Sequence, residues 1–228
     1  GVAGAAVLGA VTGALAIRRQ GIYFAMITLA FAQMIYFFCI QAPFTGGEDG
    51  LQGISRQPLL GGLIPTKDDR VLYYVVLAIF LFGYGTIYRI IHSPFGQVLK
   101  AIRDNEQRAV SLGYEADRYK LLAFVLSAAL AGLAGATKAM VLQFATLTDV
   151  SAAMSGEVVL MTLVGGLGTI IGPVVGAFII ITMQNYLAAA GEFVLVIQGM
   201  IFVVIVMAFR KGLVGELTDW WKSRRPAD

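Results

Sequence analysis

The amino-acid sequence predicts an all-α integral membrane protein, a polytopic bundle of apolar helices. Apolar residues make up 58% of the 228-residue chain, and its mean hydropathy is +0.78. Only 14% of the residues are charged, whereas an average soluble domain carries about 25%. The charges are gathered in short segments, and the apolar runs between them approach the roughly 20 residues that cross a bilayer as a helix. We expect a single transmembrane domain over residues 1–228.

The composition also excludes several classes of function. The net charge of +3 is too small to indicate a nucleic-acid partner. The chain has one histidine, His92, and one cysteine, Cys39. It therefore cannot form an internal disulfide, and it offers few ligands for a transition metal. We expect no catalytic residue, no metal site and no cofactor bound by this chain.

The apolar runs define the predicted spans in order. The first run is slightly shorter than a full span and is already under way at Gly1, which predicts that the chain is the tail of a longer protein. Three longer runs follow it, and a last one precedes a basic tail. These predicted spans cover residues 1–17, 21–41, 71–91, 119–147 and 193–210.

A further apolar run, residues 157–190, is too long for one crossing, because a single helix of this length would extend about 50 Å. Helix-breaking residues divide it: Gly165, Gly166, Gly168, Gly172 and Pro173. We therefore expect two segments, 157–171 and 172–190, which enter the membrane and return. The first is either a re-entrant half-helix or a tilted span, and irregular backbone at membrane depth must be covered by protein or line a wet cavity.

The basic residues orient the bundle. They gather at Arg18 and Arg19, over residues 89–120 and over residues 210–225. The segment 42–69 instead holds four acidic residues against two basic ones. Because loops rich in Lys and Arg stay in the cytoplasm, we expect the segment 92–118 and the C-terminus inside the cell. The loop 42–70 is expected outside.

Small residues recur every four positions in two of the predicted spans. Gly1, Ala5, Gly9 and Gly13 fall on one stripe of the first span. The fourth span repeats the pattern twice, at residues 128, 132 and 136 and at residues 131, 135 and 139. Such stripes let helix backbones approach closely in a bilayer, so we expect them to be packing faces.

The charged segment 92–118 is rich in helix formers. Pro94 suits a helix start and Gly113 suits a stop. Asp104 and Asn105 could divide the run into two short helices by capping. An apolar side with 3- and 4-residue steps is formed by Val98, Ile102, Asn105, Ala109 and Leu112. We expect a defined helix lying across the cytoplasmic surface of the membrane.

Two interpretations of this helix are open on physical grounds. It could rest on lipid headgroups, or it could dock into a groove on a partner protein. Basic and acidic residues nearly balance over the segment 92–118. Helices that bind headgroups are usually far more basic, so the balance favours a protein partner.

Four blocks of the sequence resemble one known family. They are GIYFAMITLAFAQ (residues 21–33), TGGEDGLQGI (45–54), the long block from SPFGQVLKAIRD to LAGLAGA (93–136) and LVGGLGTIIGPVVGA (163–177). Together they cover nearly the whole chain in the right order. They are similar to the permease subunits of bacterial branched-chain amino acid ABC importers, the LivM type. The resemblance implies further spans before Gly1.

The resemblance implies that the cytoplasmic segment is a coupling helix seated in a groove of an ATPase subunit. The residues implied in this coupling are Arg103, Asp104, Asn105, Glu106, Ala109, Leu112 and Gly113. The general importer pattern is Glu-Ala-Ala, three residues, then Gly. Measured from Gly113, only Ala109 also matches, and Glu106 is displaced by one position, so the match is to the subfamily's own version.

The same resemblance implies a set of partners and a location. The partners are two cytoplasmic ATPase subunits, which carry ATP and Mg, a second related permease subunit, an external substrate-binding protein and the lipid bilayer. The location is the bacterial cytoplasmic (inner) membrane. The chain itself has no Walker motif, so its energy would come from the separate ATPase subunits. The implied substrate is leucine, isoleucine, valine or a similar hydrophobic amino acid.

Two glycine-rich segments are candidates for a gate or the translocation pathway. Thr45, Gly46 and Gly47 lie in the predicted external loop and form either an external gate or docking surface, or an ordinary turn. The second segment is a helix break whose free backbone groups either face substrate or serve close packing. Its candidates are Gly165, Gly166, Gly168 and Pro173.

Three other functions compete with amino-acid import. One is a structural membrane subunit without transport, in which the cytoplasmic helix is only a scaffold contact. A sister ABC permease for urea or short amides would share every feature above. A secondary carrier driven by an ion gradient belongs to a different class, and it would need buried ionisable groups in its spans. The predicted spans contain no embedded chain of acidic residues, which argues against a proton-coupled carrier.

Overall fold

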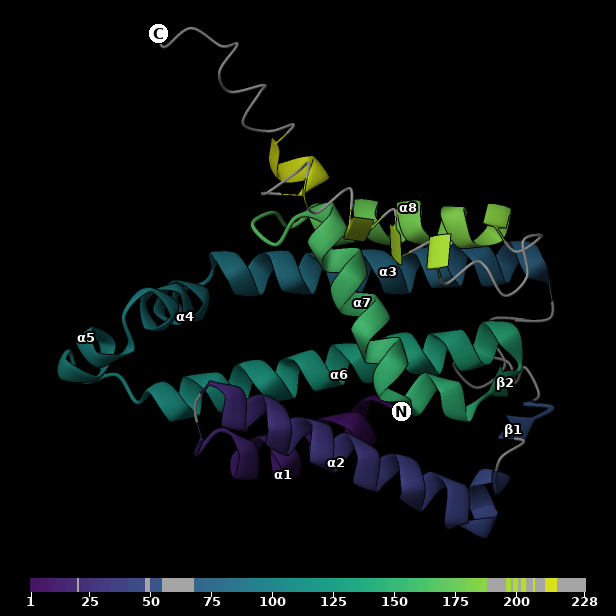
Figure 1. The fold of residues 1–228 in the computed structure, drawn as a ribbon, viewed down its shortest axis with the longest axis horizontal. Helices are drawn as coiled ribbons and strands as arrows, with labels where there is room; N and C mark the ends of the chain where they lie inside the picture. The colour runs from purple at the N-terminus through teal and green to yellow at the C-terminus, as the bar shows by residue number, and fades with distance from the viewer. Residues whose placement is uncertain are drawn as a thin grey trace, which may run out of the picture. The chain divides into compact units, whose positions relative to one another are not determined.

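The computed structural model describes residues 1–19, 21–47, 50–54 and 68–187, and parts of the segment 196–216. The predicted all-α membrane bundle is confirmed, since the described chain is mainly helical and carries three helices long and apolar enough to cross a membrane (Figure 1). The chain divides into two compact units, Gly1–Ser151 and Ala152–Asp228. Most of the predicted span 193–210 and the basic tail lie outside the described residues. The single domain over residues 1–228 stays a prediction.

The first unit contains the three long apolar helices, α2 (Ile22–Gln41), α3 (Asp69–His92) and α6 (Ala116–Leu142), and the shorter α1 (Val2–Ala16). The predicted spans 21–41 and 71–91 coincide closely with α2 and α3. The predicted span 119–147 is five residues too long at its end. The backbone of Gln143 turns into the left-handed region, with φ at 61°, and ends α6 there.

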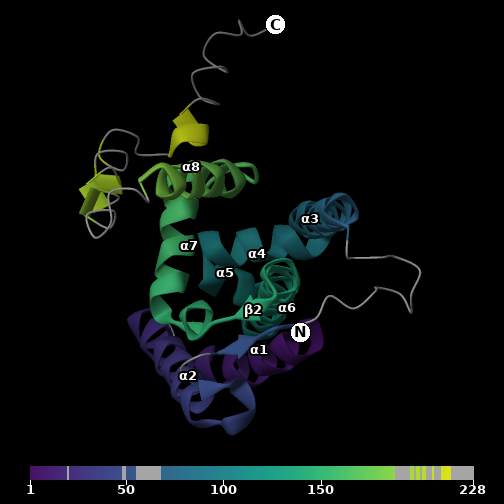
Figure 2. The same ribbon diagram turned by 90° about the vertical axis from the view of Figure 1, so that its right-hand side faces the viewer.

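The helices α1 and α6 pack through the predicted small-residue stripes. A Cβ atom added to Gly9 would lie 2.5 Å from the Cβ atom of Ala128, and one on Gly132 would collide with the Cβ atom of Ala5. Figures 1 and 2 show these two helices side by side. Close approach of this kind is what holds helices together in lipid, where apolar surface alone gives no driving force.

The two ends of α6 carry different structures (Figure 1). At its start lie two short helices, α4 (Pro94–Asp104) and α5 (Glu106–Ser111), and we call this the inner end. At its finish lies a small antiparallel pair of β1 (Leu51–Gln52) and β2 (Phe144–Ala145), in which Leu51 faces Ala145. We call this the outer end. It also includes two 3₁₀ turns, η1 (Pro43–Thr45) and η4 (Leu147–Val150).

The charged segment forms two helices rather than one, and the division falls at Asn105. Its backbone is extended, with φ at −158°, and its side-chain Oδ1 accepts a hydrogen bond of 3.0 Å from the backbone N–H of Arg108. At the start of α4, the Oγ atom of Ser93 likewise accepts from the N–H of Gly96 at 3.3 Å, and Pro94 occupies the first helical position. Both caps fit the sequence-based expectation of a helix start and a break.

The second unit contains α7 (Ala152–Gly165) and α8 (Gly172–Leu187), joined by a short turn. The predicted segment 157–171 begins five residues too late and ends six too late, because helix formation starts directly after η4 and stops at the glycine pair. With 14 residues, α7 rises about 21 Å, which is less than the hydrocarbon thickness of about 30 Å. Val164, Ile180 and Met161 form the buried core between the two helices.

Candidate functional site

The inner end of the first unit holds the predicted coupling segment against α6 through an apolar cluster. Ile102 of α4, Ala109 of α5 and Ala116 of α6 are all buried, and Val98 and Tyr119 pack against them. Phe95 of α4 also stacks on Tyr119, with ring centroids 5.6 Å apart. The two short helices are therefore fixed to the first turns of α6.

Ala109 and Leu112 lie on different sides of this segment. Ala109 is only 2% exposed, so its side chain supports the segment from within, whereas Leu112 is 71% exposed. The predicted apolar side is confirmed for Val98, Ile102 and Ala109, which share one cluster. It is wrong for Asn105 and Leu112, which are exposed. Three exposed apolar residues lie at the end of α5 and just after it, and we call them the α5 knob: Val110, Leu112 and Tyr114, whose ring also contacts Tyr119.

The remaining coupling candidates lie beside this knob. Arg103 and Asp104 are exposed and form a local ion pair of 3.3 Å. Gly113 follows α5 with φ at 89°, a left-handed conformation that ends the helix where the sequence predicts a stop. Glu106 reaches across to Lys120 of α6, with 2.5 Å between Oε1 and Nζ. Contacts of these side chains with an ATPase stay a prediction.

The external-loop candidates form a compact turn at the outer end. The Oγ1 atom of Thr45 donates within hydrogen-bonding distance of the carbonyls of Cys39, at 2.5 Å, and Ala42, at 2.6 Å. Gly46 has φ at 78°, and a Cβ atom there would collide with the carbonyl of Gly50. The glycines are therefore needed by the turn itself. A gating role for Thr45, Gly46 and Gly47 stays a prediction.

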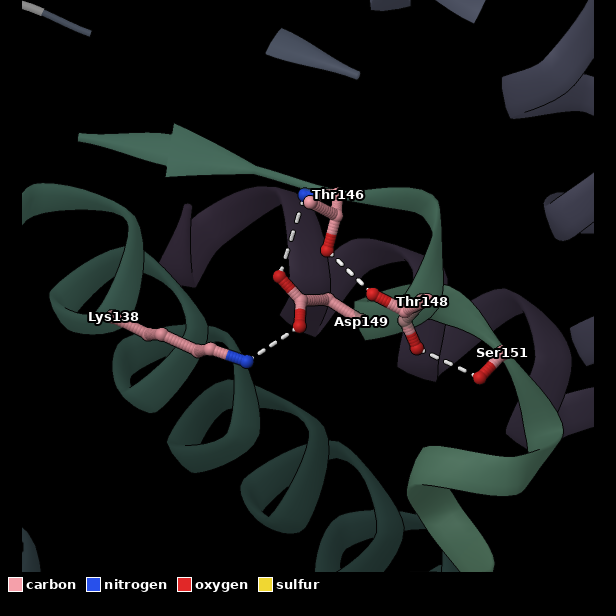
Figure 3. A network of polar contacts seen from close by, with 5 residues as sticks. All are labelled: Lys138, Thr146, Thr148, Asp149 and Ser151. Carbon is pink, nitrogen blue, oxygen red and sulfur yellow. Dashed lines mark hydrogen bonds and ion pairs between the residues drawn. The ribbon is translucent and has the colours of Figure 1, made fainter. Parts of the chain in front are cut away.

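A polar network that sequence reasoning missed closes the outer end of α6 (Figure 3). Lys138 donates to Oδ1 of Asp149 in η4 at 2.5 Å, and Oδ2 of Asp149 accepts from the backbone N–H of Thr146 at 3.5 Å. The hydroxyls of Thr146 and Thr148 are 2.6 Å apart, and Ser151 donates to the carbonyl of Thr148 at 2.7 Å. One feature of the sequence could have indicated this ion pair: Asp149 follows Lys138, the only lysine in this half of the span, by eleven positions.

The glycine candidates of the second unit lie at the turn between α7 and α8. A Cβ atom on Gly165 would collide with the carbonyl of Gly172, and Gly166 is buried with φ at 115°. Pro173 occupies the start of α8, as the helix geometry favours. Close packing thus accounts for Gly165, and the positive φ accounts for Gly166. Gly168 is exposed with open space around it, and a pathway role for any of these residues stays a prediction.

Glu157 is the one acidic side chain within the described part of α7 and α8. It accepts a hydrogen bond from the side-chain amide of Gln184 in α8, so it links the two helices and lies well inside α7. Among the described residues, no group of three or more His, Cys, Asp and Glu side chains is arranged to hold a metal ion.

The apolar helices, with a pair of charged helices docked at one end of α6 and a glycine-rich turn at the other, define a multi-pass membrane protein as the class. The sequence comparison gives the family. The chain belongs to the family described as branched-chain amino acid transport system, permease component, which matches residues 1–206.

Individual relatives agree with this family. The chain is 27% identical to the LivM permease protein of a high-affinity branched-chain amino acid transport system from Escherichia coli, over 92% of this chain and 55% of that protein. It is also 30% identical to the ribose import permease protein RbsC of Bacillus subtilis, over 73% of this chain and 51% of the relative. The chain thus spans about half the length of these curated relatives. No solved structure gives a significant match.

Proposed function

We propose that this chain is part of the permease subunit of an ATP-driven importer for branched-chain or similar hydrophobic amino acids. It would lie in the bacterial cytoplasmic membrane with its C-terminus in the cytoplasm. Its proposed partners are two cytoplasmic ATPase subunits, a related second permease subunit and an external substrate-binding protein. ATP and Mg would bind to the ATPase subunits, and this chain would perform no catalysis.

The observation that carries this proposal is the α5 knob. Val110, Leu112 and Tyr114 present apolar surface at the end of a short helix, in a segment with balanced charges. A knob of this size suits a groove on a folded protein better than a bilayer surface. The family match supports an ATPase as the owner of that groove.

The proposed mechanism follows from how the knob is attached. Closure of the ATPase dimer on ATP would displace α5, and the buried cluster around Ala109 would carry α4 and the start of α6 with it. The spans would then tip between outward-facing and inward-facing arrangements. Chemistry and force generation belong to the partner, while this chain converts the displacement into access for substrate.

The test is co-purification of the full-length permease with its ATPase subunits. Replacing Leu112 by Asp would place a charge in the apolar groove, and we expect the ATPase to be lost from the complex. Leu112→Met is the matched control, because it keeps apolar volume, and it should retain the ATPase. A Leu112→Asp complex that retains its ATPase and its ATP-driven uptake would contradict the proposal.

A sugar permease is the second candidate function, and the identity to the ribose permease RbsC favours it. Uptake of radiolabelled leucine, ribose and urea by the same reconstituted complex separates the candidates. We expect leucine to be taken up and to be displaced by unlabelled isoleucine and valine. Uptake of ribose or urea without leucine would replace the amino-acid assignment and leave the permease role in place.

A further inference from the structure

Helix α6 carries a lysine ion pair at each of its ends. Lys120 pairs with Glu106 of α5 at the inner end, and Lys138 pairs with Asp149 of η4 at the outer end. The two lysines are 18 residues apart, which is about five full turns of an α-helix, so they lie on the same face. Their separation along the axis is about 27 Å, close to the thickness of the hydrocarbon core.

The inner pair adds a polar link between α5 and α6 beside the apolar cluster around Ala109. The helix α5 has only six residues, far fewer than an isolated helix needs for stability in water. The side chains of Lys120 and Glu106 are 28% and 31% exposed. The neighbouring pair of Arg118 and Glu115 has the same 2.5 Å distance but is 80% and 59% exposed. Water screens the second pair much more strongly.

The outer pair fixes the segment that leads into the second unit. Asp149 accepts from both Lys138 and the backbone of Thr146, so one carboxylate joins α6 to the turn η4. The chain passes from η4 to Ser151, the last residue of the first unit, and α7 begins at Ala152. The segment that Asp149 holds on α6 therefore lies directly before α7 in the chain.

We propose that α6 is a strut between α5 and η4, with Lys120 and Lys138 as the positioning residues that transmit displacement at its two ends. This inference rests on the proposed function, because it assumes that an ATPase moves α5. Its content is the route: force enters through Glu106 together with the adjoining cluster around Ala109, passes along one face of α6 and leaves at Asp149. Both lysines act through their carboxylate partners, and neither needs to contact substrate.

The test uses the complete importer in liposomes, with the binding protein present, and measures leucine uptake per ATP hydrolysed. Lys120→Gln and Lys138→Gln each remove one charge, and the carboxylate of Asp149 still caps Thr146 in the second variant. We expect each to lower uptake per ATP at least about five-fold, the size of a weak coupling free energy, while ATP hydrolysis and complex assembly persist. Lys120→Arg and Lys138→Arg should keep most of the coupling.

Two controls separate a strut from ordinary structural support. The two ends of a strut act in series. The double variant of Lys120→Gln with Lys138→Gln should therefore lose no more uptake per ATP than the single variant with the larger loss. Independent effects would instead multiply the two losses. The exposed pair is the matched control, and Glu115→Gln with Arg118→Gln should leave uptake per ATP unchanged. Inner-pair reversal by Glu106→Lys with Lys120→Glu should restore coupling relative to either single change.

A distance measurement tests the strut without depending on the transported solute. Spin labels on Gln107, which is exposed on α5 and outside the α5 knob, and on Phe144, which is also exposed, in a Cys39→Ser background report the length from the inner to the outer end. The distribution of distances between the labels should be narrow, and its mean should be the same with and without nucleotide. Lys120→Gln should broaden the distribution.

Three results would overturn the strut. They are unchanged uptake per ATP in both single variants, multiplied losses in the double variant, and a narrow spin-label distance distribution in Lys120→Gln. Absence of ATP-driven uptake by the unaltered complex would instead refute the proposed function.

Discussion

Gly132 of α6 faces Ala5 of α1 so closely that a Cβ atom on Gly132 would collide with the Cβ atom of Ala5. The neighbouring stripe of α6 differs, because a Cβ atom added to Gly135 would have no other atom within 4 Å. One of the two predicted small-residue stripes is thus used inside the described first unit, while the other is open there. This difference gives the first prediction its control.

Replacing Gly132 by Ala should destabilise the helix pair, because the added methyl group must push α1 away. We expect a loss of about 1–3 kcal/mol in the free energy of unfolding, as is usual for overpacking. Gly135→Ala should be neutral or slightly stabilising, since Ala is the better helix former. Thermal unfolding of the purified protein in detergent measures both, and equal midpoints for the two variants would contradict the packing.

The register of the outer strand pair can be tested with cysteines. Leu51 and Ala145 are directly opposite, and opposite residues of antiparallel strands have Cα atoms about 4.5–5.5 Å apart, within disulfide range. In a Cys39→Ser background, Leu51→Cys with Ala145→Cys should therefore oxidise readily. Leu51→Cys with Phe144→Cys should not, because successive side chains of a strand point to opposite faces. Non-reducing electrophoresis after mild oxidation distinguishes the two.

The side-chain cap at Asn105 should contribute measurably to the local stability of α5. Asn105→Ala removes the acceptor for the N–H of Arg108 and should cost about 1 kcal/mol. The amides of residues 106–111 should then exchange with deuterium about five-fold faster, because local opening becomes easier by that amount. Asn105→Asp retains a capping oxygen and should exchange like the unaltered protein. Equal rates in all three would show that the cap does not hold α5.

The hairpin of the second unit depends on Gly176 of α8, although the sequence-based pathway candidates do not include it. A Cβ atom on Gly176 would collide with the carbonyl of Met161 in α7, and backbone cannot move aside as a flexible side chain can. Gly176→Ala should lower the thermal unfolding midpoint by several degrees. Gly156→Ala in α7 is the control, because nothing lies within 4 Å of its added methyl group. A midpoint equal to that of Gly156→Ala would refute the contact.

The orientation of the bundle is predicted by its basic residues and is directly measurable. Leu112 and Phe44 lie at the inner and outer ends and are 71% and 69% exposed. In a Cys39→Ser background, a membrane-impermeant maleimide should label Phe44→Cys in intact spheroplasts. Leu112→Cys, expressed without the ATPase subunits, should be labelled only after permeabilisation, as the positive-inside rule predicts. The reverse pattern would place the α5 knob outside the cell and exclude an ATPase partner.

The parts of the fold that depend on local patterns were predictable. The apolar runs gave α2 and α3 to within about two residues, and the small-residue repeat gave the seam between α1 and α6. Asn105 was a visible capping residue, so the division of the charged segment was foreseeable. These features depend on residues within a few turns of one another, where helix geometry alone relates sequence to structure.

The parts that depend on distant or unusual backbone geometry were not predictable. Gln143 ends α6 in a left-handed conformation that favours glycine, so the sequence suggested a longer span. That early ending places Asp149 beside Lys138. The orientation of α5 depends on one extended residue, Asn105, and therefore the burial of Ala109 and the exposure of Leu112 could not be separated by periodicity.

The pairing of Leu51 with Ala145 has a consequence for biogenesis. The two strands are more than 90 residues apart in the chain, and α3 and α6 are synthesised between them. During co-translational insertion the first strand leaves the ribosome long before its partner exists. The outer strand pair can close only after α6 has been inserted, so its formation marks the completion of membrane insertion for this half of the protein.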